Sequence, residues 1–416
     1  MKIYKYIILA FVLGLSQQSF SQVSKDKLDA YLVEAAENNP GLKSSFNQYM
    51  AAMEKIPQVG TLPDPQFAFG YFIQPVETRL GPQKASFALK QAFPWFGLLA
   101  TKETVEAEKA EAKYELFENA KANLYFEVKS AYYTYYFFNK AIEITESNME
   151  ILRVFKRLSL VKIETGQASI VDELRVELEI NDLENQLALY KDSKKGFQAK
   201  FNNLLDKEYD APIETPLDLW KEKLPYEYGA ITDSINANNH QLKSIDHKMN
   251  AFLKQEDVAR KEGMPKFNIG INYIIVGENP NSVDPNNGKD AILFPSVGIS
   301  IPIYRRKYHG MIKEAQLLKQ AELDNKEDMK NSLSSVFEKT YTEFSDGERR
   351  IALNKTQTEI AKKVLDVLIT SYSTDSKDFE EVLRIERQLL KYELAYEKAM
   401  IDNNTAVAFI QYLIGN

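Results

Sequence analysis

The chain of 416 residues contains no cysteine and only three histidines. The absence of cysteine excludes disulfide bridges, thiolate nucleophiles, thiolate metal ligands and a lipid anchor on an N-terminal cysteine. His240 and His247 are seven residues apart, which places them two turns apart on one helix face, and His309 is isolated. Because no His-x-x-x-His or Glu-x-x-His pair occurs, we predict no metal site.

Sequence signatures of catalysis are also missing. The chain has no Gly-x-Ser-x-Gly segment, no phosphate-binding loop and no dinucleotide-binding fingerprint. Carboxylate pairs are common, but 59 acidic residues spread over charged helices produce such pairs without any catalytic role. The net charge of −7 with scattered basic residues gives no nucleic-acid-binding footprint. We therefore expect no cofactor and no enzyme activity, and keep an exported hydrolase of peptidoglycan as a minor alternative.

Long hydrophobic runs are scarce. The N-terminal segment 1–21 combines Lys2 and Lys5 with a short apolar stretch and the small residues Ser19 and Ser21, which is typical of a secretory signal peptide. Its apolar stretch is far shorter than the roughly 20 residues that a spanning helix needs, so we predict export and removal of this segment. No later segment is apolar for long enough to span a membrane as a helix, and any membrane insertion must therefore use strands.

What the chain does contain is an internal repeat. Three short segments of the first half recur in the same order in the second half: 38–44 at 238–244, 65–70 at 265–270, and 174–177 at 383–386. The offset changes from 200 to 209 residues, which indicates an insertion in the second half, and the loop at 277–292 is the obvious place. We predict a first structural repeat at 22–205, a connector rich in proline at 206–229, and a second repeat at 230–416.

Each half is predicted to contain a helix, two short strands, a very long helix, a tight turn and another long helix. The expected elements are helix 25–56, strands 65–73 and 85–93 and helices 98–163 and 170–205 in the first half, and helix 230–261, strands 266–276 and 294–303 and helices 308–371 and 377–413 in the second. Residues 100–165 contain neither glycine nor proline, and as one helix they would span on the order of 100 Å. Apolar residues at alternating steps of three and four predict coiled-coil packing.

The expected strands alternate large apolar residues with small or polar ones, and each has about the length of a tilted transmembrane strand. The predicted lipid-facing residues are Phe67, Phe69, Tyr71, Phe87, Leu89, Phe267, Ile269, Ile271, Val297, Ile299 and Ile301. A soluble sheet packed on helices would show the same alternation. The long loops at 74–84 and 277–292, rich in proline, glycine and asparagine, and the small residues on the other face favour a lipid face and a wet lumen.

Four strands cannot close a barrel, because open edges are not tolerated in hydrocarbon and the smallest membrane barrels have about eight strands. If these strands span a membrane, several chains must pool them. Two chains would supply eight strands and three would supply twelve. Membrane insertion therefore predicts an oligomer, while the residues alone leave the number of chains open.

Several short segments carry a family resemblance: Asn39-Pro40, Leu62-Pro63-Asp64-Pro65, Gln91-Ala92-Phe93-Pro94-Trp95-Phe96-Gly97, and Gly166-Gln167-Ala168-Ser169 with Asp172-Glu173-Leu174. With the twofold repeat, they make essentially all of 22–416 resemble the TolC family of outer-membrane efflux proteins. The chain looks closest to the branch that serves heavy-metal and drug pumps of the resistance-nodulation-division type. The resemblance implies a mainly α fold with a small β part. It further implies a homotrimer with a long coiled-coil α-helical barrel and a twelve-stranded transmembrane β-barrel, to which each chain contributes four strands.

The same resemblance implies a function. The protein would be the exit duct of a tripartite efflux system in the cell outer membrane, in contact with its lipid and with a long periplasmic part. Its partners would be a periplasmic adaptor (membrane-fusion) protein and an inner-membrane pump, and the connector and C-terminal residues would form a belt around the tunnel. The alternative is a periplasmic coiled-coil adaptor or scaffold without a membrane barrel. Such adaptors usually carry a lipoyl-like β-domain between their helices, and the alternating strands would then need another role.

The resemblance also places adaptor contacts at the turns between the paired long helices, where the candidate residues are Lys162, Gly166, Ser169, Tyr372 and Asp375. In the family the first turn often reads Arg-Tyr-x-x-Gly. This chain keeps a basic residue and the glycine but lacks the tyrosine, and an aspartate replaces the glycine of the second turn. Candidates for a negative ring at a periplasmic aperture are Asp375, Asp378 and Glu381. The alternative is a solvated helix N-terminus, where the helix dipole favours acidic residues.

Overall fold

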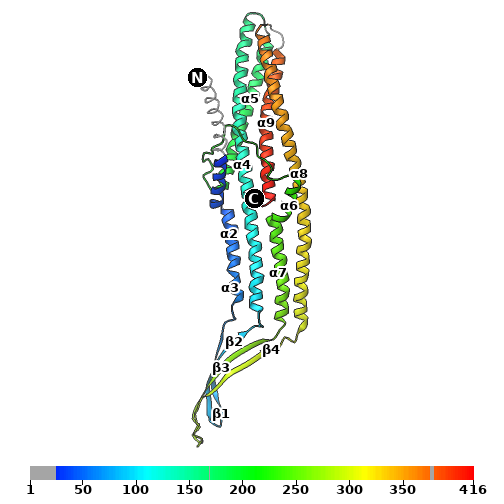
Figure 1. The fold of residues 1–416 in the computed structure, drawn as a ribbon. Helices are drawn as coiled ribbons and strands as arrows, with labels where there is room; N and C mark the ends of the chain where they lie inside the picture. The colour runs from blue at the N-terminus through cyan, green and yellow to red at the C-terminus, as the bar shows by residue number, and fades with distance from the viewer. Residues whose placement is uncertain (1–24, 168, 375–378) are drawn as a thin grey trace, which may run out of the picture. The chain divides into compact units, whose positions relative to one another are not determined.

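The computed structural model describes residues 25–167, 169–374 and 379–416 (Figure 1). The predicted signal peptide at 1–21 lies outside these ranges. The described residues are mainly helical, and their strands form a four-stranded sheet. The predicted fold class, mainly α with a small β part, is confirmed.

Contacts between residues divide the chain into two compact units. The first, here called the helical unit, contains the described residues within 25–45, 117–240 and 330–416. The second, here called the strand unit, contains residues 46–116 and 241–329. Each unit therefore combines segments from both halves of the sequence.

Long helices dominate the chain. A helix through residues 25–38 is followed by α2 (Pro40–Met53), α3 (Lys55–Gly60), α4 (Leu98–Glu164), α5 (Ile170–Leu204), α6 (Tyr228–Asn238), α7 (His240–Glu262), α8 (Arg305–Thr374) and α9 (Phe379–Leu413). α4 has 67 residues and α8 has 70, and both contribute to the two units. Within the described ranges, no helix combines the length and the apolar character that crossing a membrane requires.

The sheet belongs to the strand unit. Its strands are β1 (Gln66–Thr78), β2 (Gly81–Phe93), β3 (Lys266–Val276) and β4 (Ala291–Ser300), and they pair antiparallel in that order (Figure 1). One hairpin, β1–β2, comes from the first half of the sequence and the other, β3–β4, comes from the second half. β2 and β3 join the two hairpins. β1 and β4 are therefore the edges, each with one neighbour in the described chain.

The first hairpin corrects the prediction of an exposed loop at 74–84. β1 and β2 continue through most of this range, and only a short turn separates them, so that prediction was wrong. Pro75 favoured a loop, but proline is tolerated at an irregularity of a strand, where regular ladder pairing is interrupted. The pairing shifts register between Tyr71 and Val76, around this proline. The second hairpin does contain a long loop, at 277–290.

The core of the helical unit is built around aromatic residues of α4. Tyr132 and Tyr136 are buried, and the ring of Phe201 from α5 lies 6.0 Å from that of Tyr132 between centroids. The Tyr132 hydroxyl donates to the carbonyl of Glu214 (3.2 Å), and the Tyr136 hydroxyl accepts from the N–H of Leu219 (3.0 Å). These bonds fix the connector between α5 and α6 against α4.

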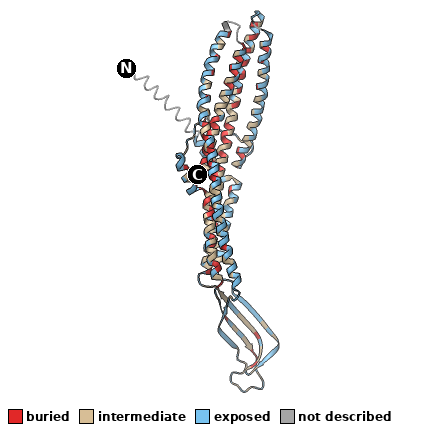
Figure 2. Cartoon of the chain, turned by 90° about the vertical axis from the view of Figure 1, so that its right-hand side faces the viewer, coloured by how far each residue is buried: buried red, intermediate tan, exposed pale blue. Residues whose placement is uncertain are grey.

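A second apolar cluster joins α4, α5, α8 and α9. It includes Leu152 of α4, Val176 of α5, Leu365 of α8 and Val382 of α9, all buried. Figure 2 shows buried positions recurring along these helices. Apolar residues at alternating steps of three and four place one stripe of each helix in such a core.

Two asparagines at repeat-related positions make the same kind of contact. The Asn39 side-chain amide donates to the carbonyl of Leu204 at the end of α5 (3.0 Å), and the Asn239 amide donates to that of Leu413 at the end of α9 (2.9 Å). The last carbonyls of a helix have no partner within the helix, so each asparagine completes one C-terminus. The two positions differ by the 200-residue offset of the repeat.

We predict that Asn239→Ala destabilises the protein more than Asn39→Ala. Asn239 is 2% exposed, so its truncation leaves a buried carbonyl without this donor, at a cost of about 1–3 kcal/mol. Asn39 is only partly buried, and water can replace its amide. The measurement is thermal unfolding of the mature protein in detergent, followed by circular dichroism. The exposed neighbour Asn238→Ala is the control, and equal midpoints for Asn238→Ala and Asn239→Ala would contradict the prediction.

Candidate functional site

The predicted lipid-facing residues that lie within the strands share one face of the sheet. Paired positions on neighbouring strands carry their side chains on the same face. The register joins Phe67 to Leu89 and Leu89 to Ile271, Phe69 to Phe87 and Phe87 to Tyr273, Phe267 to Ile299, and Ile269 to Val297. Tyr71 continues this face along β1, and Ile301 follows the last residue of β4.

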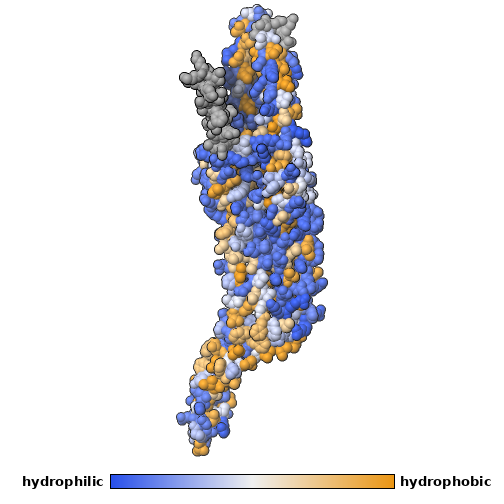
Figure 3. Space-filling model, viewed as in Figure 1, coloured by the Kyte–Doolittle hydropathy of each residue, from blue (hydrophilic) through white to orange (hydrophobic). Residues whose placement is uncertain are grey.

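This apolar face is exposed in the chain. Phe67, Tyr71 and Val297 are 67%, 70% and 64% exposed. Aromatic rings contact each other across strands, with the centroids of Phe69 and Phe87 5.2 Å apart. Figure 3 shows apolar residues gathered on the helix ends and on the part of the sheet next to them. A contiguous apolar surface of this kind marks a site of interaction with another protein or a membrane.

The opposite face carries small and polar side chains. Gln66, Lys90, Asn268, Gly270, Ser296 and Gly298 are among the residues that line a hollow on it. A Cβ at Gly270 would lie 2.7 Å from the Leu89 carbonyl oxygen, so this glycine permits close approach of two strands. Alternation between an apolar face and a small, polar face is the pattern of a strand between lipid and an aqueous lumen.

The tip of the β1–β2 hairpin is bound to the loop that follows β3. The N–H of Gly277 donates to the carbonyl of Pro82 (2.7 Å), and the N–H of Gly288 donates to that of Leu80 (2.7 Å). Gly81 has φ of +125°, and a Cβ there would lie 1.8 Å from the Gly277 carbonyl oxygen. Only glycine fits this position without movement of the backbone. The loops of the two hairpins are therefore one linked structure.

The first predicted turn between long helices is capped on both sides. At the end of α4, the N–H of Gly166 donates to the carbonyl of Ile163 (3.0 Å) and the N–H of Gln167 to that of Lys162 (2.8 Å), which is a Schellman motif. Gly166 has the positive φ, +71°, that this motif requires. Ser169 caps the start of α5. Gly166 and Ser169 are both exposed.

Lys162 and Tyr372 join the α4–α5 pair to the α8–α9 pair. The Lys162 ammonium donates to the backbone carbonyl of Tyr372 (2.5 Å) and lies 4.6 Å from the centroid of its ring. Lys162 is 6% exposed and Tyr372 is 1% exposed. The sequence pattern favoured a surface role for both residues, whereas the fold turns both side chains into the bundle. A local pattern could not reveal a contact between residues 210 positions apart.

Among the predicted aperture residues, Glu381 lies in α9, while Asp375 and Asp378 lie outside the described residues. Glu381 forms a hydrogen-bonded ion pair with Arg384 of the same helix, which lowers the pKa of its carboxyl. The nearby carboxylate of Glu380 pairs with an arginine of α5 (3.2 Å). These pairs neutralise the two glutamates locally, and a ring of negative charge stays a prediction.

No group of three or more histidine, aspartate or glutamate side chains in the described part of the chain is arranged to hold a metal. His247 has its Nδ1 atom 2.8 Å from a carboxylate oxygen of Glu108. The Nε2 atom of His240 lies 3.2 Å from the carbonyl oxygen of Gly415. These two histidines therefore join neighbouring segments of the fold.

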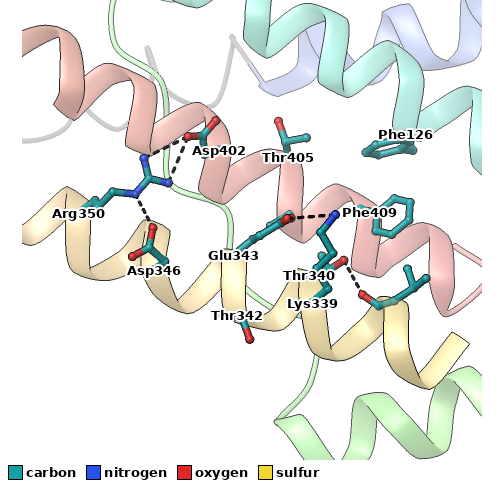
Figure 4. Close-up of a pocket in the computed structure, with 12 residues that line it drawn as sticks. Phe126, Lys339, Thr340, Thr342, Glu343, Asp346, Arg350, Asp402, Thr405 and Phe409 are labelled. Carbon is teal, nitrogen blue, oxygen red and sulfur yellow. Dashed lines mark hydrogen bonds and ion pairs between the residues drawn. The ribbon is translucent and has the colours of Figure 1, made fainter. Parts of the chain in front are cut away.

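A groove in the helical unit lies between α8 and α9, with Phe126 of α4 in its wall (Figure 4). Its arginine is paired, since Arg350 contacts Asp346 (2.7 Å) and Asp402 (3.2 Å). The rings of Phe126 and Phe409 pack edge to face, with centroids 5.0 Å apart. The arginine of this groove therefore has its charge balanced by two carboxylates.

Comparison with solved structures identifies the fold. The chain is similar to VceC, an outer membrane protein of Vibrio cholerae, with 14% identity and a TM-score of 0.74 over 94% of this chain and 97% of that one. It is similar to the CmeC outer membrane channel of Campylobacter jejuni, with 13% identity and a TM-score of 0.74 over 94% and 86%. It is also similar to the open state of the MtrE outer membrane channel of Neisseria gonorrhoeae, with 15% identity and a TM-score of 0.75 over 94% and 89%.

Sequence comparisons give no match, since no protein-family model and no curated protein sequence matches the chain. The three-dimensional likeness nevertheless extends over nearly all of this chain and most of each channel. The chain therefore has the fold of these outer-membrane channels. The fold expected from the TolC-family resemblance is confirmed.

We predict that Lys162→Met loosens the contact between the two helix pairs. Methionine keeps a long apolar stem but cannot donate to the Tyr372 carbonyl, and loss of this buried bond costs about 1–3 kcal/mol. Hydrogen exchange of the amides at 365–374 should therefore accelerate by about fivefold or more. The control is Lys191→Met, which removes an exposed ion pair with Glu146. Unchanged exchange in Lys162→Met would show that the contact adds no stability.

Proposed function

We propose that the mature chain is the exit duct of a tripartite efflux system in the outer membrane of a Gram-negative envelope. It passively conducts substrates that an inner-membrane pump and a periplasmic adaptor deliver. The observation that carries this proposal is the exposed apolar face of a sheet in a chain that has the fold of outer-membrane channels. A duct needs no catalytic residue and no cofactor, because the pump supplies the energy.

The apolar face supports contact with lipid. Phe69 and Ile299 are 60% and 57% exposed, although each is large enough to anchor a protein core. Exposing apolar surface to water costs about 25 cal/mol per Å², and contact with hydrocarbon removes this cost. The small and polar residues of the other face, such as Asn268 and Ser296, suit a water-filled lumen.

The unpaired edges of the sheet support pooling of strands between copies. β1 and β4 each have one neighbour in the described chain, and neither edge can stay open in hydrocarbon. We propose that β1 of one copy pairs with β4 of the next. The TolC-family resemblance favours three copies and a barrel of twelve strands.

The first helix turn supports an adaptor contact. Gly166 and Ser169 are exposed there, and the buried Lys162 holds the turn in place beside α8. Val171 and Leu178 on the following turns of α5 are 49% and 66% exposed. They lie seven residues apart, on the side of α5 away from the core, so they present an apolar stripe to another helix. We propose that an adaptor helix docks on this stripe, and that the pump is of the resistance-nodulation-division type.

A periplasmic scaffold without a barrel fits the sheet less well. In that role the phenylalanine and isoleucine side chains of the strands would stay in water, with both strand edges unpaired. Such a surface binds other chains nonspecifically. The duct proposal gives both the face and the edges a partner.

The test is the location and native mass of the mature protein. We expect it in the outer-membrane fraction and, after extraction with detergent, at the mass of three chains in native mass spectrometry. The exposed apolar face and the open strand edges are the physical reason. Recovery of a water-soluble monomer without detergent would overturn the barrel and the efflux role together.

Adjacent substitutions in β3 test which face meets lipid. Ile269→Lys places a charge on the apolar face, and at the bilayer midplane this costs about 2–4 kcal/mol. We expect this variant to lose outer-membrane insertion. Asn268→Lys places the same charge on the polar face and should insert while changing the ion selectivity of single channels in planar bilayers. Equal insertion of the two variants would contradict the assignment of the faces.

A further inference from the structure

A carboxylic acid without a partner is buried in the apolar core of the helical unit. Glu386 of α9 has 0% exposure, and among the described residues neither of its carboxylate oxygens has a hydrogen-bond partner. Its neighbours Leu383 and Leu389 belong to the apolar cluster that α9 shares with Val176 of α5 and Leu365 of α8. A charged carboxylate is strongly unfavourable in such surroundings, so packing favours the protonated acid.

The charged groups around Glu386 are engaged with one another. Glu179 of α5 pairs with Arg387 of α9 (2.5 Å), and Glu393 of α9 pairs with Lys362 of α8 (2.8 Å). Burial, reinforced by the negative charge of Glu179, outweighs the attraction of Arg387 and raises the pKa of Glu386 to about 8. The packed side chain is therefore mainly neutral at pH 7.

The repeat-related glutamate of the first helix pair has a cation. Glu177 lies 209 residues before Glu386, at the offset of the repeated segment that contains both. It is exposed, and its carboxylate lies 3.4 Å from the Lys156 ammonium of α4, which also pairs with Glu173 (3.1 Å). The residue 209 positions after Lys156 is Leu365 of α8, which belongs to the apolar cluster. The second pair has thus kept the glutamate and lacks the lysine.

We propose that Glu386 makes the α8–α9 pair sensitive to proton loss, so that its ionisation releases α9 from the core while the α4–α5 pair stays packed. When solvent reaches the carboxyl, its pKa is the ordinary 4.5, and when α9 is packed the pKa is about 8. At a pH between 4.5 and about 8, the Glu386 carboxyl is ionised in the opened form and protonated in the packed form. The stability of packed α9 therefore falls as pH rises, by up to tenfold in the opening equilibrium per pH unit. It levels off above about pH 8, and the effect vanishes below pH 4.5.

The experiment is hydrogen exchange of the mature protein in detergent between pH 5 and pH 9, with Glu386→Gln as the reference at each pH. Glutamine has the shape of the neutral acid and cannot ionise. At a given pH the intrinsic exchange chemistry is the same in both proteins, so the ratio of their rates reports the opening of α9. We expect the ratio for amides 379–392 to rise by up to tenfold per pH unit to about pH 8 and then to level off.

A matched control is Glu177→Gln, which removes the repeat-related carboxylate. The ratio of its hydrogen-exchange rates to those of the wild-type protein should differ from one in α4 and α5 only. In α9 this ratio should stay near one at every pH. Glu386→Leu should remove the pH dependence as well, and it keeps the test valid if the amide of Glu386→Gln packs poorly. The proposal would be overturned if the ratio of wild-type to Glu386→Gln exchange rates in α9 did not change with pH. It would also be overturned if this ratio rose equally in α5 and α9. The readout needs neither conduction nor an adaptor, so its failure leaves the proposed function untouched.

Discussion

A sheet with two unpaired edges and one exposed apolar face is the constraint on which the rest of the chain depends. β1 and β4 each have an unpaired edge within the described chain, and large apolar side chains cover one face. In water the face would bind other apolar surfaces and the edges would bind other strands. Contact with hydrocarbon removes the cost of the exposed apolar face. It raises the cost of the open strand edges, because unpaired backbone groups are most unfavourable there. In the proposed duct, copies of the chain join their strand edges inside a membrane, which would cover both the edges and the apolar face, so insertion and assembly would depend on each other.

The helices, in turn, must support two hairpins that come from different halves of the sequence. α4 begins soon after β2 and α8 soon after β4, so each hairpin leads directly into a long helix. In the helical unit, the connector ties these helices together. It meets α4 at Tyr136, and it meets α9 at the buried Asn404, which accepts from the N–H of Glu222 (2.9 Å) and donates to the carbonyl of Trp220 (2.7 Å). A segment without regular structure is thereby fixed to both helix pairs.

The features that the sequence predicts well are those with local causes. The predicted helix at 98–163 agrees with α4 to within one residue, because Gly166 and Ser169 end one helix and start the next through backbone and side-chain caps. The faces of the strands follow from alternation alone. The strand ends do not, because tolerance of Pro75 depends on the register shift between β1 and β2 around it.

The candidate site at the turns is less predictable, because part of it depends on a contact between residues that are far apart in the sequence. The burial of Lys162 depends on α8, far along the chain, and no local pattern carries that information. The exposed glycine and serine of the first turn are readable from sequence because they serve the turn itself. The contact that holds this turn in place is a property of the packed helices.

The two helix pairs share repeat-related positions, but the surroundings of these positions differ. Both halves keep the asparagine that completes a long helix, at Asn39 and Asn239, because each helix end needs the same bond. The glutamates have diverged, since Glu177 has a lysine and Glu386 has an apolar core. On the proposal made above, ionisation of Glu386 weakens the α8–α9 pair alone, so the two helix pairs of one chain would respond differently to pH.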